Sequence, residues 1–245
     1  MIADGAVLYR EATCSTCKTT LRTSDLVHVL MEATLGRDVS LLEGFTDLQS
    51  LNILEAQASG SIHHFLRHLP DYTCFEYFDG VAPGQYKDGV MSNDLQNLSF
   101  ESESFDVVIT QEVLEHVADP ERAFQEIARV LKPGGLHVFS VPLHEGRPTL
   151  SRAGKLKVFH GDPVRSGGAV VHTDWGDDMD EIIRAASGME TEAYATHVFH
   201  TPEEITNVDQ SFSEYVLKSA LHYFKYNMLV FVSQKPKATG EGEEA

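Results

Sequence analysis

The chain contains little cysteine, little positive charge and no long apolar run. Its 245 residues include three cysteines, and its 19 Lys and Arg stand against 37 Asp and Glu, giving a formal net charge of -18. Three cysteines do not make a disulfide framework, so we expect a reducing compartment, the cytoplasm. A surface this acidic repels phosphate backbones and anionic lipid, so neither nucleic acid nor a membrane is an expected partner. No apolar run approaches the roughly 18 residues of a membrane-spanning helix, and no signal peptide is recognisable.

The composition and the hydrophobic pattern of the chain predict one large domain with short terminal segments and one insertion. A hydrophobic content of 42% is enough to bury one sizeable core. We expect residues 1–50 to form an extension with a Cys-x-x-Cys sequence and a helix that packs on the main domain. Residues 51–235 are the expected main domain, with 143–176 as an insertion. Residues 236–245 are small, polar and charged, which is typical of a disordered tail.

From residue 51 onwards, apolar runs of strand length alternate with helical patterns. The expected strands are 51–56, 72–78, 89–95, 105–110, 136–142, 190–199 and 226–234, and the expected helices are 61–69, 119–135, 177–189 and 211–224. The clearest helix begins at Asp119 and Pro120, a capping residue and a favoured first residue, and stops at Pro133–Gly135. This alternation predicts an α/β fold: a doubly wound, mostly parallel seven-stranded sheet with helices on both faces.

One long segment carries an ordered series of motifs. Residues 99–142 read SFESESFDVVITQEVLEHVADPERAFQEIARVLKPGGLHVFSVP. This series resembles the central region of class I S-adenosylmethionine (SAM)-dependent methyltransferases, and a weaker likeness extends from Ile53 to the end of the chain. The resemblance implies a Rossmann-like methyltransferase fold, SAM as cofactor, and direct transfer of a methyl group to a small molecule or a glycan precursor.

The carboxyl ends of the strands hold the candidate cofactor residues, because ligands of open α/β sheets sit beyond these ends. The resemblance implies that Glu76 accepts hydrogen bonds from the ribose hydroxyls and that Asp94 meets the adenine amino group. The alternatives are a solvated acid for Glu76 and a turn residue for Asp94. The full set of expected cofactor residues is Glu55, Ala56, Ser59, Gly60, Glu76, Tyr77, Asp94, Leu95, Gln111 and Glu112.

The turn after the first strand, ILEAQASGS at 53–61, has little glycine. Methyltransferases of this family usually carry an acid followed by glycines at alternate positions. Here those positions hold Gln57, Ser59 and Ser61, and Gly60 does not fall on any of the alternate positions. Glycine permits a positive φ and close backbone approach to a ligand. The departure leaves two readings: a variant turn that still holds SAM, or a catalytically silent binding protein on the same fold.

The irregular segment 143–176 is rich in His, Asp, Gly and Arg, and a connection of this length is usually functional or disordered. We expect it to form the acceptor site and to act as a lid. The expected catalytic residues are His172, Asp174 and His116, and the expected acceptor-binding residues are His144, His160 and Trp175. The same residue types suit a divalent metal, but no metal site is assigned, and a plain polar surface loop is the simpler alternative.

Two further questions stay open at this level. Cys14 and Cys17 have the spacing of half a zinc site, but no second pair follows, so free thiols are the simpler reading; Cys74 fits a core position. A nucleotide-dependent oxidoreductase would share the sheet, yet the glycine set of a dinucleotide site is missing after the first strand. The sequence therefore favours a SAM-dependent methyltransferase, monomeric or homodimeric.

Overall fold

The computed structural model of the chain describes residues 19–144, 146–162, 165–195 and 229–238. Cys14 and Cys17, the expected helix at 211–224 and most of the expected tail lie outside the described residues. The expected strands at 190–199 and 226–234 are described only in part. The fold below concerns the described ranges.

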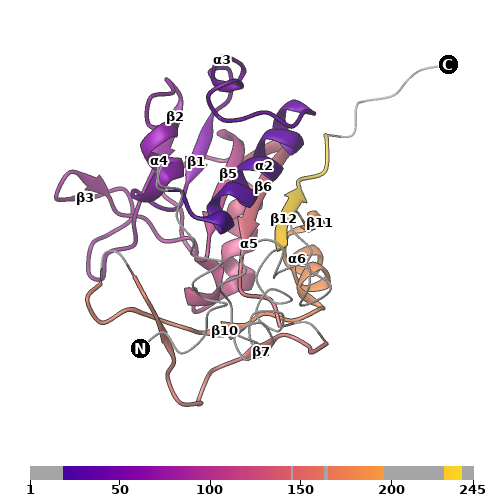
Figure 1. Ribbon diagram of the computed structural model, residues 1–245. Coiled ribbons are helices and arrows are strands. Elements are labelled where there is room, and N and C mark those ends of the chain that lie inside the picture. Colours follow the sequence, from indigo (N-terminus) through magenta and orange to yellow (C-terminus); the bar gives the residue numbers. More distant parts are fainter. Residues whose placement is uncertain (1–18, 145, 163–164, 196–228, 239–245) are drawn as a thin grey trace, which may run out of the picture.

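One mixed sheet forms the centre of the molecule (Figure 1), in the strand order β11-β12-β6-β5-β1-β2. Its strands are β1 (Ile53–Glu55), β2 (Tyr72–Cys74), β5 (Phe105–Gln111), β6 (Leu131–Ser140), β11 (Glu190–Ala195) and β12 (Leu229–Gln234). Parallel pairing joins the strands β2, β1, β5 and β6, and antiparallel pairing adds β12 and then β11. The expected doubly wound, mostly parallel architecture is confirmed.

The described part of the sheet has six strands instead of the predicted seven. Residues 89–95 supply β4 (Val90–Met91), which pairs antiparallel with β3 (Tyr86–Lys87). Left-handed backbone at Asp88 and Gly89 (φ 51° and 82°) turns the chain back on itself, which makes this local pairing possible. A parallel bridge between Glu76 and Ser92 links the segment to the residues that follow β2.

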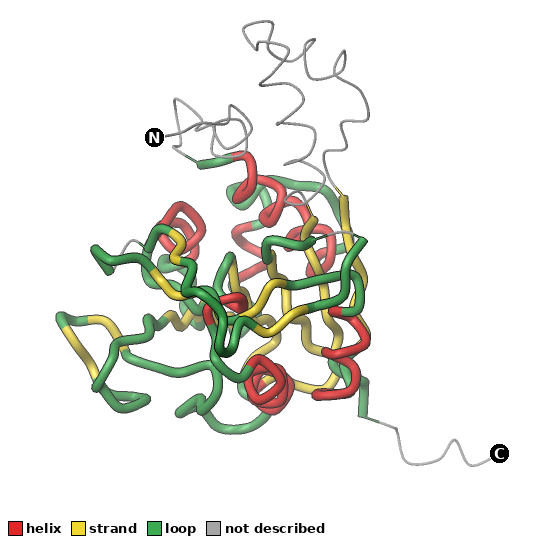
Figure 2. Tube along the Cα trace, turned by 90° about the horizontal axis from the view of Figure 1, so that it is seen from below, coloured by secondary structure: helices red, strands yellow, loops and turns green. Residues whose placement is uncertain are grey.

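Helices cover both faces of the sheet (Figure 2). On one face lie α2 (Leu21–Leu35), α3 (Phe45–Leu48) and α4 (Gly60–Leu66), and on the other lie α5 (Pro120–Val130) and α6 (Met179–Ser187). Leu26 and Leu30 of α2 are fully buried in one core cluster with Ile53 and Val107 of the sheet. Phe124 of α5 centres the other cluster. Hence the helix at the start of the described chain is part of the main core.

Local sequence explains the ends of α5. The Asp119 carboxylate accepts a hydrogen bond from the Arg122 amide (3.0 Å), and Pro120 occupies the first turn, as predicted. The helix ends at Val130, before Pro133, and Leu131 already belongs to β6. The Pro-Gly-Gly sequence therefore lies at the start of the strand rather than at the end of the helix.

The segment after β6 is built from short ladders and not from a plain loop. Its strands are β7 (Leu150–Ser151), β8 (Phe159–His160), β9 (Ala169–Val170) and β10 (Thr173–Asp174). β7 pairs with β10, and β8 pairs with β9, both antiparallel. The segment crosses the carboxyl-end side of the sheet, where the His172 amide donates to the Glu115 carbonyl (2.7 Å). In Figure 1 it forms the lower edge of the molecule.

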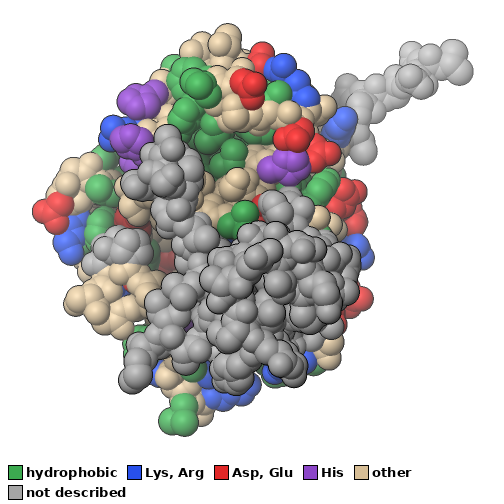
Figure 3. Space-filling view, viewed as in Figure 1, with side chains coloured by type: hydrophobic (Ala, Val, Ile, Leu, Met, Phe, Trp, Pro, Cys, Tyr) green, Lys and Arg blue, Asp and Glu red, His purple; other side chains and the backbone are tan. Residues whose placement is uncertain are grey.

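The surface carries charges of both signs. On the coloured part of the face in Figure 3, acidic side chains are interspersed with Lys and Arg. Among the helices of the described ranges, none has the length and apolar character needed to cross a bilayer.

Candidate functional site

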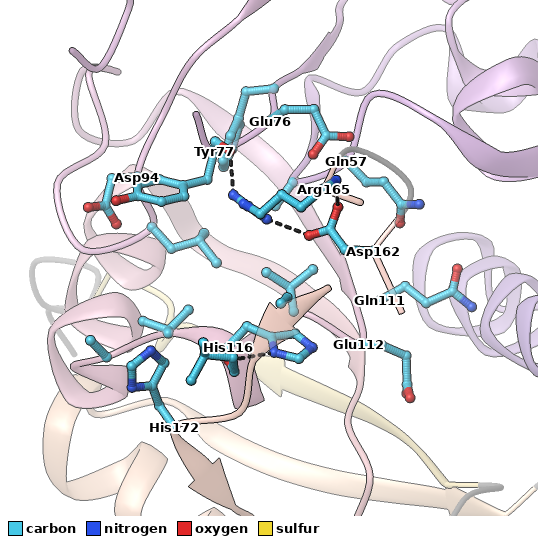
Figure 4. A pocket seen from close by; sticks show the side chains of 18 of the residues that line it. Gln57, Glu76, Tyr77, Asp94, Gln111, Glu112, His116, Asp162, Arg165 and His172 are labelled. Atoms are coloured by element: carbon cyan, nitrogen blue, oxygen red, sulfur yellow. Dashed lines mark hydrogen bonds and ion pairs between the residues drawn. The ribbon is translucent and has the colours of Figure 1, made fainter. Parts of the chain in front are cut away.

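A cavity of about 540 Å³ opens at the carboxyl ends of β1, β2 and β5. Seven of the ten expected cofactor residues line it: Ala56, Glu76, Tyr77, Asp94, Leu95, Gln111 and Glu112. In Figure 4, Glu76 and Tyr77 lie on one side of the cavity, and His116 and His172 lie on the other. The carboxyl ends of parallel strands meet at one edge of the sheet, which explains why the stretches after β1, β2 and β5 converge here. Asp94 and Leu95 follow β4, outside the main sheet.

Glu76 links the second strand end to the turn after the first. Its Oε1 accepts a hydrogen bond from the Ala58 amide (2.9 Å), and its backbone bonds to Met91 and Asn93. Burial raises the pKa of Glu76, although the bond from Ala58 opposes this shift. The side chain is thus a fixed acceptor in the cavity wall rather than a freely solvated acid.

The glycine-poor turn keeps one left-handed residue. Gly60 has φ 85° and begins α4, but it does not line the cavity. Gln57, which stands where the family usually has a glycine, lines the cavity, and its side-chain Nε2 donates a hydrogen bond to Ser59 Oγ (3.4 Å). A Cβ at Gly60 would meet only Gln57 Nε2, at 3.5 Å. Backbone conformation, and not lack of space, is therefore what requires glycine here.

Asp94 is a turn residue that also lines the cavity. Its Oδ1 accepts bonds from the amide and the side chain of Gln96 (2.8 and 3.0 Å), which is an Asx turn. It also lines the cavity, beside Leu95 and Phe75. The neighbouring Asn93 is 1% exposed and braces this turn through Ser99. A carboxylate therefore lies next to apolar side chains in this part of the cavity wall.

Glu112, directly after β5, has a strained backbone. Its φ of 55° is left-handed, which costs a non-glycine residue on the order of 1–3 kcal/mol. The Ser140 carbonyl and hydroxyl hold it there through bonds of 2.9 Å to its amide and carboxylate. Arg22 of α2 lies 3.2 Å from the same carboxylate. The fold therefore presents a carboxylate and a guanidinium together in the cavity wall.

Described residues of the segment 143–176 line one side of the cavity. Arg165 forms an ion pair with Asp162, donates to the Tyr77 carbonyl (2.6 Å), and lies 5.5 Å from the Tyr77 ring centroid. Figure 4 shows this pair between Glu76 and His116. His172 and His116 also line the cavity, and His116 Nδ1 donates to the Val170 carbonyl (2.8 Å).

Three expected cofactor residues lie away from the cavity lining: Glu55, Ser59 and Gly60. Glu55 is 3% exposed and accepts a hydrogen bond from the Tyr72 hydroxyl (2.6 Å). Burial raises the pKa of Glu55 to about 8. Its carboxyl group is engaged inside the fold, between β1 and β2, instead of facing a ligand.

Four expected residues of the acceptor segment also lie outside the cavity lining: His144, His160, Asp174 and Trp175. Trp175 is fully buried, and its ring centroid lies 5.8 Å from that of Phe124, so it is a core residue and not an apolar wall of the pocket. Asp174 forms an ion pair with Arg152 (2.7 Å). Burial lowers the pKa of His144, whose amide donates to the Trp175 carbonyl.

Sequence reasoning missed several lining residues, above all Arg22, Asn93 and Arg165. Arg22 belongs to a helix that was expected only to pack on the main domain. Arg165 reaches Tyr77 across 88 positions of sequence. The position of Asn93 directly before Asp94 was an available signal, whereas nothing local marks the two arginines.

Comparison with known proteins agrees with this geometry. Residues 62–139 match a family model described as a methyltransferase domain. The chain is 40% identical over 47 residues to a ubiquinone biosynthesis O-methyltransferase of Coxiella burnetii, covering 19% of this chain and 20% of that protein. A protein of the same description from Caulobacter vibrioides is 59% identical over 32 residues, 13% of each chain. The chain thus matches a fifth or less of the length of these relatives.

Solved structures with a similar outline are distant in sequence. A complex of the Haloferax volcanii Trm112 methyltransferase activator with a methyltransferase matches at TM-score 0.48 and 17% identity, covering 84% of this chain and 96% of that one. A Burkholderia thailandensis 1,6-didemethyltoxoflavin-N1-methyltransferase matches at TM-score 0.48 and 15% identity, covering 87% and 79%. These low values carry no weight in the assignment. The match at 62–139 thus shows a likeness to a methyltransferase domain over about a third of the chain, in the part that holds β2, β5, α5 and most of α4 and β6.

Proposed function

We propose that the chain binds SAM in the cavity and transfers its methyl group to a small-molecule acceptor. The observation that carries this proposal is the fixed carboxylate of Glu76, held by the Ala58 amide at the rim of the cavity. A carboxylate in this position can accept hydrogen bonds from both hydroxyls of a ribose. The bound cofactor supplies a methyl group on a positively charged sulfur, so the acceptor needs positioning more than activation.

The charges of the cavity suit SAM. Its described lining has five acidic side chains and two arginines: Glu76, Asp79, Asp94, Glu112, Asp162, Arg22 and Arg165. An acid-rich wall favours the sulfonium and ammonium groups of SAM. Arg22 supplies a guanidinium for the methionine carboxylate, beside Glu112 for the ammonium (Arg22–Glu112 3.2 Å). Asp94 and the apolar Leu95 and Phe75 suit adenine.

In this proposal the acceptor side of the site is formed by His116, His172, residues 161–162 and residues 165–170. His172 and His116 line the cavity opposite Glu76, so their imidazoles can contact an acceptor without touching the ribose. The Asp162–Arg165 ion pair, which also contacts Tyr77, lines this side of the cavity. The acceptor is a small molecule in this proposal, because described residues between 161 and 172 cover one side of the cavity.

The experiment is isothermal calorimetry of SAM and S-adenosylhomocysteine (SAH) binding to the full chain. Binding of both, with loss in Glu76→Ala, supports the methyltransferase. The second candidate is a catalytically silent binding protein, favoured by Gln57 in place of a glycine at the cavity wall. SAM binding without methyl transfer to any of a panel of hydroxyl and amine acceptors would favour the silent protein.

A further inference from the structure

Three potential metal ligands converge next to the cavity. Glu115 and His116 belong to the short 3-10 helix η1 (Leu114–His116), and His160 comes from β8 in the segment after β6. One ligand atom from each lies within 4.8 Å of the others. Glu115 Oε1 is 3.6 Å from His116 Nε2 and 3.8 Å from His160 Nδ1. The two imidazole rings stand nearly perpendicular, with centroids 5.2 Å apart.

The Glu115 carboxylate is buried without a hydrogen bond from the described residues. The residue is 1% exposed, and neither carboxylate oxygen has a hydrogen-bond partner among the described residues. Burying a carboxylate without a partner costs several kcal/mol or more, so buried acids are normally paired or bind a metal. The main chain fixes the position, because the His172 amide bonds to the Glu115 carbonyl. The carboxylate therefore faces the two imidazoles, and a cation between the three groups would neutralise its charge.

His116 is already oriented as a ligand. Its Nδ1 donates a proton to the Val170 carbonyl at 2.8 Å, which leaves the lone pair on Nε2. That Nε2 is the atom nearest to Glu115. A backbone carbonyl that fixes the tautomer of a histidine in this way is the usual outer partner of a metal-bound imidazole.

We propose that Glu115, His116 and His160 bind one divalent transition-metal cation, such as Mn²⁺ or Zn²⁺, beside the cavity. Two imidazoles and one carboxylate suit these cations better than Mg²⁺ or Ca²⁺, which prefer oxygen ligands alone. Ligands about 2.1 Å from a shared ion lie about 3.0–3.4 Å from each other. Small movements close the gaps of 3.6 and 3.8 Å to this spacing.

Three protein ligands leave coordination positions open. His116 lines the cavity, so these positions face the acceptor side and suit an acceptor that carries an oxygen donor. The ion would position this acceptor opposite the cofactor. This role rests on the proposed methyl transfer, whereas binding of the cation does not depend on it.

Titration of the full chain with Mn²⁺, followed by electron paramagnetic resonance, tests the site. Mn²⁺ is chosen because the thiols of Cys14 and Cys17 are soft ligands that favour Zn²⁺. We expect one tightly bound Mn²⁺ in the wild type and about tenfold weaker binding or worse in Glu115→Gln and His160→Ala. His68→Ala is the matched control, since exposed His68 forms a ring pair with His64 elsewhere on the surface and should leave binding unchanged.

A thermal-shift series separates loss of the ligand from loss of the fold. Mn²⁺ should raise the Tm of the wild type and of His68→Ala, but not that of Glu115→Gln, whose Tm without metal should equal or exceed that of the wild type. Wild-type Mn²⁺ affinity in both Glu115→Gln and His160→Ala overturns the site, as does loss of binding in His68→Ala. SAH affinity is measured on the same samples: Mn²⁺ binding without SAH binding refutes only the proposed function, and the reverse refutes only the cation site.

Discussion

Replacing Glu76 tests the cofactor assignment most directly. The carboxylate is held by the Ala58 amide and faces the cavity, so in the proposed complex it accepts hydrogen bonds from two ribose hydroxyls. A hydrogen bond to a charged group contributes about 1.5–3 kcal/mol. Loss of one such contribution weakens binding by about 10- to 100-fold. We therefore expect Glu76→Ala to raise the Kd for SAM, measured by calorimetry, by at least about tenfold.

Glu76→Gln separates charge from shape. The amide oxygen of the new side chain can still accept the Ala58 bond, so the turn keeps its position while the charge is lost. Burial raises the pKa of Glu76, so wild-type SAM affinity should fall on acidification at a higher pH than for an ordinary glutamate. The Gln variant should bind more weakly and lack this pH step. Exposed Glu101→Gln is the control, and unchanged SAM affinity in both Glu76 variants would refute the assignment.

The other predictions concern the buried acid, the core and the acceptor side. The pKa of Glu55 in the fold, about 8, exceeds its unfolded value, so the stability that Glu55 contributes is full below about pH 4.5 and is lost as pH rises through 8. In Glu55→Gln the urea midpoint of unfolding should therefore depend less on pH between pH 5 and 9 than in the wild type. An unchanged pH dependence would contradict this. Trp175→Ala should lower the free energy of unfolding by about 3–5 kcal/mol in urea titrations; a smaller loss would argue against a core role. Gly60→Val should destabilise by about 1–2 kcal/mol through its positive φ, and Gly60→Asn by less; equal effects would remove the backbone argument. His172→Ala should lower kcat more than SAM affinity; the opposite result would move this residue to the cofactor side.

The proposed lid is tested by hydrogen exchange. Amides in 146–162 and 165–176 should exchange fast in the free protein and more slowly with SAH and an acceptor bound. The short ladders β7–β10 and β8–β9 are only two residue pairs each, which is why we expect weak protection. Strong protection without ligand would identify the segment as a fixed wall instead.

Local sequence determined the central elements of this fold. The β-branched run of β5 and the Asp119-Pro120 start of α5 act over a few residues, so their signals survive in the sequence alone. Glu76 and Glu112 were recognisable as cavity-lining residues because the ends of parallel strands share one edge of the sheet. Asp94 also lines the cavity, but it follows β4, which lies outside the main sheet. These predictions needed the order of elements but no side-chain contacts.

Only the tertiary structure decided which other side chains reach the site. Arg165 bonds to Tyr77 across 88 positions, and His160 meets Glu115 across 45; neither distance leaves a local pattern. Residues 89–95 carry a strand-like sequence, but the left-handed turn before them favours pairing with β3 over a place in the main sheet. Trp175 was indistinguishable from a pocket wall until its packing on Phe124 was known. Short-range conformational preferences depend on adjacent residues and can therefore be predicted from the sequence. Burial and long-range pairing depend on the packing of the whole core, so only the folded structure determines them.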